Sequence, residues 1–103
     1  MPGWLAKALR RIHALAAALR IRLTYKANRE AVGLGLDLED VRQLLMGLTV
    51  GESAGRQASA ATGEWLYIFK PGVGGVRLYL KLILRDDCVV VSCHDDDDAH
   101  DTQ

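Results

Sequence analysis

Residues 76–85 alternate between aliphatic and mostly polar side chains, and this pattern constrains the fold more than any other feature of the chain. The even positions are Val or Leu throughout, whereas Arg77, Tyr79 and Lys81 stand at odd positions. Successive side chains of a β-strand point to opposite faces of the sheet. We therefore expect a strand with one face on the core. Its outer face would carry two cations and a phenol, which suits binding of a phosphodiester backbone.

The chain supplies helices first and strands afterwards. Apolar residues at three- and four-residue steps predict an amphipathic helix over residues 4–19. An extended bridge is expected at residues 21–25, a short helix at 26–32, and a further helix behind an N-cap at Asp37. Strands joined by tight turns are expected at residues 56–60, 64–70, 76–85 and 88–94. This order predicts an α+β fold in which N-terminal helices pack on one face of a C-terminal antiparallel sheet.

The strand expected at residues 64–70 can face the core in two ways. Trp65, Tyr67 and Phe69 share one face, and Leu66 and Ile68 share the other. Either set can pack on the core, and an exposed aromatic set would offer stacking surfaces for bases.

The formal net charge of zero conceals an uneven distribution of charge. Asp95–Asp98 and Asp101 hold five of the 13 acidic residues, so residues 1–93 carry 13 basic and eight acidic side chains, a net charge of +5. We expect one folded domain over residues 1–94 and an acidic tail over residues 95–103. A basic domain favours polyanionic partners. The tail is either a disordered, solubilising segment or a mimic of RNA phosphates that shields the basic face.

The two cysteines and the hydropathy indicate the compartment. Cys88 and Cys93 are an odd number of positions apart in one predicted strand, so we expect them on opposite faces and unable to form a disulfide. Reduced thiols in a cytoplasmic protein are the expectation. No uncharged apolar run approaches the roughly 20 residues that cross a bilayer, so no membrane partner is expected.

Four residues carry the clearest catalytic potential: Arg77, Tyr79, Lys81 and His94, the last at the end of the final predicted strand. RNA cleavage needs a base for the 2′-hydroxyl proton, cations that stabilise the phosphorane, and an acid for the departing oxygen. These residue types supply all three without a metal. The alternative is an ordinary solvated outer face of an antiparallel sheet, with His94 merely solvated.

Arg56, Lys70 and Arg85 add positive charge to the same region of the chain. A metal site formed by His94, His100 and the aspartates is a further alternative. Because flexible acidic tails rarely preorganise a metal, we expect no metal and no other cofactor.

Several motifs resemble, in the same order, those of the MqsR family of bacterial toxins. They are residues 34–41 (LGLDLEDV), Gly47-Leu48, Trp65, Lys70-Pro71, residues 76–81 (VRLYLK) and residues 90–92 (VVS). The resemblance covers residues 20–94. It implies a type II toxin with a RelE-like fold, a metal-independent endoribonuclease that cuts messenger RNA and arrests growth. It also implies a cognate antitoxin that neutralises the toxin within a higher-order complex.

The resemblance also assigns roles to individual residues. Tyr79 and Lys81 fall on the family's YLK positions, where the tyrosine belongs to the active site. His94 takes the place of a lysine that follows the closing strand, and Arg56 replaces another active-site lysine if the alignment shifts by one residue. The implied catalytic set is Tyr79, Lys81, His94 and Arg56. Arg77, Lys70 and Arg85 are expected to bind substrate because of their charge and their place in the β region.

One departure from the family pattern keeps other functions open. Leu66 stands where better-known members carry a catalytic glutamine. A non-catalytic RNA- or protein-binding module built on the same fold is therefore the alternative to a nuclease. A toxin with another target, such as a topoisomerase, is a third hypothesis.

Overall fold

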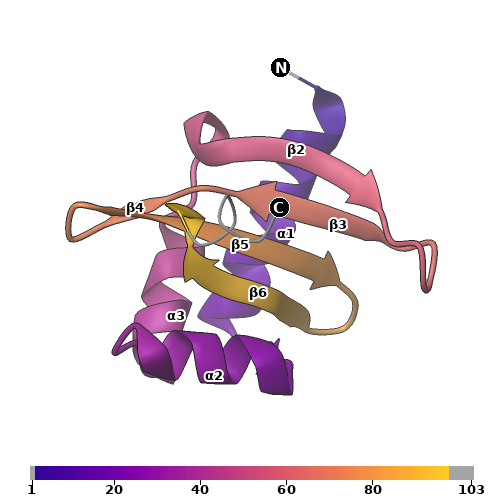
Figure 1. Cartoon of the computed structure of the whole chain (residues 1–103). Helices are drawn as coiled ribbons and strands as arrows, with labels where there is room; N and C mark the ends of the chain where they lie inside the picture. The colour runs from indigo at the N-terminus through magenta and orange to yellow at the C-terminus, as the bar shows by residue number, and fades with distance from the viewer. Residues whose placement is uncertain (1, 98–103) are drawn as a thin grey trace.

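The computed structural model describes residues 2–97, in which helices pack against one face of a sheet (Figure 1). The elements in chain order are α1 (Gly3–Ala17), β1 (Ile21–Leu23), α2 (Tyr25–Gly33), α3 (Leu38–Met46), a 3₁₀ turn (Val50–Glu52), β2 (Ser53–Ala58), β3 (Trp65–Phe69), β4 (Gly72–Val73), β5 (Val76–Leu84) and β6 (Cys88–Asp95). Helices precede most of the sheet, so the predicted α+β class is confirmed.

The start of α3 follows from local side-chain chemistry. Asp37 Oδ1 accepts a hydrogen bond from the backbone N–H of Asp40 at 2.8 Å, and Asp40 Oδ2 accepts one from the N–H of Asp37 at 3.0 Å. This reciprocal capping box satisfies two N–H groups that a helix terminus leaves without partners. The N-cap predicted at Asp37 is confirmed.

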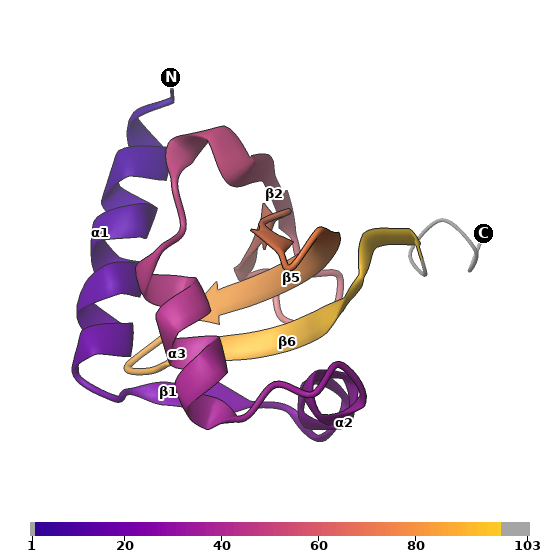
Figure 2. The same ribbon diagram turned by 90° about the vertical axis from the view of Figure 1, so that its left-hand side faces the viewer.

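The strands lie in the order β1-β6-β5-β3-β2, and β4 pairs with β5 beside this path. All neighbouring strands are antiparallel except β1, which runs parallel to β6. The bridge expected at residues 21–25 is thus a strand, and it makes the sheet mixed. Seen at right angles, α1 and α3 lie on one side of β5 and β6, and α2 lies beside the lower end of the sheet (Figure 2).

The core lies between α1, α3 and the even-numbered side chains of β5. Leu80, Leu82 and Val90 are fully buried in it, together with Phe69. Tyr67 packs against the same core, so the aromatic face of β3 is the one that faces the helices. The alternation in β5 therefore leaves Tyr79 and Lys81 on the face that the helices do not cover.

One extra residue changes the register between β5 and β6. Lys81 pairs with Ser92, whereas Leu82 pairs with Val90, so Val91 has no partner of its own and forms a β-bulge. The bulge shifts side-chain parity along β6. As a result Cys88 and Cys93 both face the core and are both buried, and the expectation that they lie on opposite faces is wrong. Both thiols are free.

Helix α2 forms hydrogen bonds to the free edge of β6 next to the bulge. Glu30 Oε1 accepts a hydrogen bond from the backbone N–H of Cys93 at 3.0 Å, and the Lys26 ammonium donates to Ser92 Oγ at 2.9 Å. The N–H of Thr24 donates to the carbonyl of Val90 at 3.0 Å. These bonds satisfy strand groups that no neighbouring strand reaches, because β1 pairs with β6 only as far as Val90.

The final described residues belong to the folded part of the molecule. Strand β6 continues through Asp95, and the side chain of Asp96 is only 9% exposed. Residues 98–103 of the acidic tail, including His100, lie outside the described residues, so the expected disorder of that segment stays a prediction. Between residues 2 and 97, no helix is both long and apolar enough to cross a bilayer.

The buried thiols give a first testable prediction. Burial raises the pKa of Cys88 to about 12 and the pKa of Cys93 to about 11. Both thiols should therefore stay protonated at pH 8 and react with a disulfide reagent only after unfolding. Reagent release should be slow in buffer and should reach two thiols per chain in guanidinium. Rapid reaction of either cysteine in the native protein would contradict this packing.

Candidate active site

Tyr79 and His94 form the centre of the candidate site. They are cross-strand partners in β5 and β6, and their rings stack with centroids 5.2 Å apart and planes inclined by 11°. Side chains directly opposite each other in an antiparallel pair are close enough to interact. Without the bulge at Val91, Tyr79 would be paired one residue earlier, with Cys93. The bulge therefore places the imidazole beside the phenol.

Two lysines flank the stacked pair. The Nζ atoms of Lys70 and Lys81 each lie 5.7 Å from the centroid of the Tyr79 ring. Lys81 follows on the same face of β5, and Lys70 comes directly after β3. Arg77, two residues before Tyr79, is exposed on this face. The structure thus brings together five of the residues predicted from sequence, and it surrounds an aromatic pair with positive charge.

The backbone sets the proton positions of His94. Its Nδ1 lies 2.9 Å from the carbonyl oxygen of Asp95. A carbonyl oxygen can only accept a hydrogen bond, so this contact assigns the proton to Nδ1. In the neutral ring Nε2 is then the basic nitrogen, and it can take a proton from a substrate hydroxyl.

Asp96 lies beneath the same cluster and was expected to be part of the tail. Its Oδ1 is 3.4 Å from the Lys70 ammonium, an ion pair without hydrogen-bond geometry. Burial raises the pKa of Tyr79 above its ordinary value, and the negative charge of Asp96 raises it further. Both effects keep the phenol neutral, so the Tyr79 hydroxyl keeps its proton at physiological pH and is able to donate a hydrogen bond.

Arg85 lies away from this cluster. It follows the end of β5, six residues beyond Tyr79, which corresponds to about 20 Å along a strand. Its guanidinium binds both oxygens of Glu64, with the shorter contact at 2.6 Å. The hydrogen bond from Arg85 is the main reason that the pKa of Glu64 falls to about 2. The predicted role of Arg85 in binding substrate gains no support from this placement.

Arg56 lies on the opposite face of the sheet from Tyr79. It pairs with Tyr67, whose side chain faces the core, and its guanidinium carbon lies 4.6 Å from the Trp4 ring and 3.9 Å from the Trp65 ring. The structure therefore does not bring Arg56 to the residues with which it was grouped. The neighbouring Gln57, opposite Leu66, shares the uncovered face instead.

Comparison with known families now bears on this cluster. A family model described as "Motility quorum-sensing regulator, toxin of MqsA" matches residues 6–95. The chain belongs to this family. The match confirms the resemblance and includes Tyr79, Lys81 and His94. Comparison with curated proteins yields no significant match.

Membership makes the protein an MqsR-family toxin of a toxin–antitoxin system, and such a toxin has an antitoxin as its partner. Its stacked pair lies within the matched residues, whereas Asp96 comes directly after them. Within residues 2–97, the toxin has no group of His, Cys, Asp and Glu side chains that could hold a metal ion. His100, which the alternative metal site would need, lies outside the described part of the chain.

Two residues near the candidate site of this MqsR-family toxin, Asp96 and Gln57, were not predicted from the sequence. Asp96 was assigned to the tail because a run of aspartates looks uniformly solvated, and nothing in the run distinguishes its buried member. Gln57 was missed because β2 carries a register shift between Ser53 and Arg56. The sequence signal that could have pointed to Gln57 was the one-residue uncertainty in aligning the neighbouring Arg56 with a lysine of the family.

Substitution of Asp96 tests the electrostatics of the site. Asp96→Asn removes the negative charge that raises the pKa of Tyr79, so this pKa should fall while staying above its ordinary value because burial persists. Asp97→Asn, at an exposed position, is the matched control and should change it less. Carbon-13 NMR of tyrosine Cζ against pH measures both, with Tyr79→Phe assigning the resonance. An unchanged or higher pKa in Asp96→Asn would refute the contact.

Proposed function

We propose that this MqsR-family toxin is a metal-independent endoribonuclease that cleaves messenger RNA on the uncovered face of its sheet. The observation that carries the proposal is the stacked Tyr79–His94 pair with two ammonium groups on its flanks. A base and fixed cations at one open position are two of the three elements that cleavage through the 2′-hydroxyl needs, and water can supply the third, a proton for the departing oxygen. The cognate antitoxin would neutralise the toxin by preventing RNA from reaching or using this face.

In the proposed reaction, Nε2 of neutral His94 takes the proton of the 2′-hydroxyl. The 2′-oxygen attacks the adjacent phosphorus, and the bond from phosphorus to the 5′-oxygen breaks. The products are a 2′,3′-cyclic phosphate and a 5′-hydroxyl end, whose oxygen takes its proton from water. The imidazolium then releases its proton to solvent, which restores the neutral base.

The cations supply stabilisation of the transition state. Lys81 and Arg77 hold the scissile phosphate and offset the charge that develops on its oxygens. The neutral phenol of Tyr79 donates a hydrogen bond that orients the phosphate. Lys70 takes part only to the extent that RNA competes with Asp96, because the carboxylate of Asp96 already offsets the charge of the ammonium.

A second function is favoured by one observation. Leu66, at the position where the resemblance implies a catalytic glutamine, has no polar atom in its side chain to offer to substrate. A toxin that binds RNA or protein through the same face without cleaving is the alternative, and the assay below separates the two.

Replacing the stacked pair tests the nuclease. His94→Ala and Tyr79→Phe should each lower cleavage of a defined RNA, by about 10²–10⁴-fold for the base, and the double variant should be inactive. Activity of the parent protein should persist in EDTA and leave cyclic phosphate ends that mass spectrometry detects. Tyr25→Phe, at a residue of α2 that is 79% exposed, is the matched control and should cleave normally.

The same assays test the site assignment and separate the nuclease from the non-catalytic function. Circular dichroism should show an intact fold, because both side chains lie outside the core. Equal cleavage by the double variant and the parent would refute the assignment. RNA binding without cleavage by the parent would favour the non-catalytic function.

A further inference from the structure

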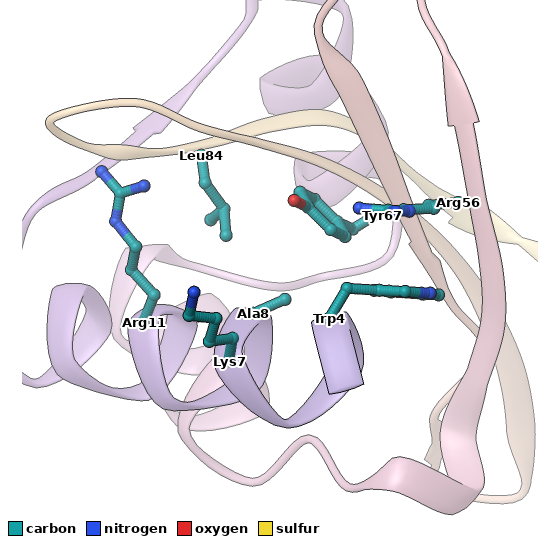
Figure 3. A pocket seen from close by; sticks show the side chains of 7 residues that line it. All are labelled: Trp4, Lys7, Ala8, Arg11, Arg56, Tyr67 and Leu84. Atoms are coloured by element: carbon teal, nitrogen blue, oxygen red, sulfur yellow. The ribbon is translucent and has the colours of Figure 1, made fainter. Parts of the chain in front are cut away.

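A second cationic site lies on the helix side of the sheet, away from Tyr79 and His94. It is a cleft of about 410 Å³ between α1 and the strands. Its lining residues include Trp4, Lys7 and Arg11 of α1 and Arg56, Tyr67 and Leu84 of the sheet (Figure 3). Its volume is in the range of small-molecule and cofactor sites.

The charges around this cleft are not neutralised inside the protein. Within residues 2–97, none of the ion pairs includes Lys7, Arg11 or Arg56. Arg11 donates to the backbone carbonyl of Arg85 at 2.5 Å, which fixes the guanidinium but leaves its charge and its other N–H groups available. Lys7 and Arg11 rise from one face of α1 toward the cleft (Figure 3), as residues four apart on a helix must.

Arg56 is held in place by stacking. Its guanidinium carbon lies over the Trp4 ring at 4.6 Å and over the Trp65 ring at 3.9 Å, contacts that do not use its N–H groups as hydrogen-bond donors. A planar guanidinium fixed in this way is a preorganised donor for phosphate oxygens. The Tyr67 hydroxyl points into the same space (Figure 3) and adds a further donor. The donors thus match an anion with several oxygen acceptors.

We propose that this cleft binds a phosphate of single-stranded RNA, as a second contact beyond the cleaving face. The inference rests on the proposed ribonuclease function. Strand β2 forms the edge of the sheet and lies two strands from β5, or about 10 Å at the usual strand spacing. An RNA strand that leaves Tyr79 can pass over this edge and reach Arg56.

The aromatic rings favour RNA over an acidic peptide. Trp65, the first residue of β3, is 45% exposed. The Arg56 guanidinium, which stacks on the Trp65 ring, lines the cleft. Indole rings stack with bases irrespective of sequence, whereas a carboxylate-bearing peptide would use only the cations. The cleft and the neighbouring Trp65 ring therefore combine the two elements of single-strand binding, a positively charged surface and a stacking surface.

Removing the two α1 cations tests the site. Binding of a short fluorescent 2′-O-methyl RNA, which lacks the attacking hydroxyl, is measured by anisotropy at several salt concentrations. In Lys7→Ala/Arg11→Ala the affinity should fall, and the slope of log Kobs against log salt should flatten by about 0.7 for each phosphate that the protein no longer neutralises. The matched control, Arg10→Ala/Arg22→Ala, removes two exposed cations outside the cleft and should change the slope less.

Each other outcome has a definite meaning. Equal slopes in the two double variants would overturn the proposal, even if the parent cleaves RNA. A flatter slope in the cleft variant than in the control variant, with no cleavage of RNA by the parent, would support the cleft and refute the nuclease. Thermal stabilisation by inorganic phosphate or adenosine monophosphate, abolished in the cleft variant while RNA binding is kept, would assign the site to a small ligand and overturn the RNA proposal. If the cleft variant lost antitoxin binding but bound RNA as the parent does, the cleft would be assigned to a protein partner and the RNA proposal would be overturned.

Discussion

The register between β5 and β6 depends on Val91, the extra residue that lets the strand bend and resume pairing one position later. Because of this bulge, Cys93 enters the core and His94 comes to stack on Tyr79. The bulge is held from outside by α2, which satisfies the free edge of β6 through Glu30. A helix that belongs to the N-terminal half thus determines which side chains of the last strand meet on the uncovered face.

Local patterns predicted the parts of the fold that local chemistry determines. The apolar period of α1, the capping box at Asp37 and the alternation in β5 each depend on residues close together in the sequence. The bulge has no such signature, because Val89, Val90 and Val91 are identical and carry no information about register. The parallel pairing of β1 was equally hidden, since its three residues match many partners.

The candidate site likewise contains residues whose positions the sequence predicts and residues whose positions it does not. Tyr79 and Lys81 were predictable because one strand carries both, and their shared face follows from alternation. His94 lies in another strand, so its position depended on a register that the sequence does not state. Arg56 was grouped with them by charge and resemblance, yet its strand shift turns it toward the helices, where the indoles of Trp4 and Trp65 hold it.

The parallel pairing of β1 with β6 has a consequence for synthesis of the protein. Residues 21–23 find their strand partner only in residues 88–90, so this edge of the sheet cannot form before residues 88–90 have been synthesised. Long-range pairing of this kind forms late in folding. In a nascent chain, the strand that completes the sheet is therefore β6, the strand that carries His94.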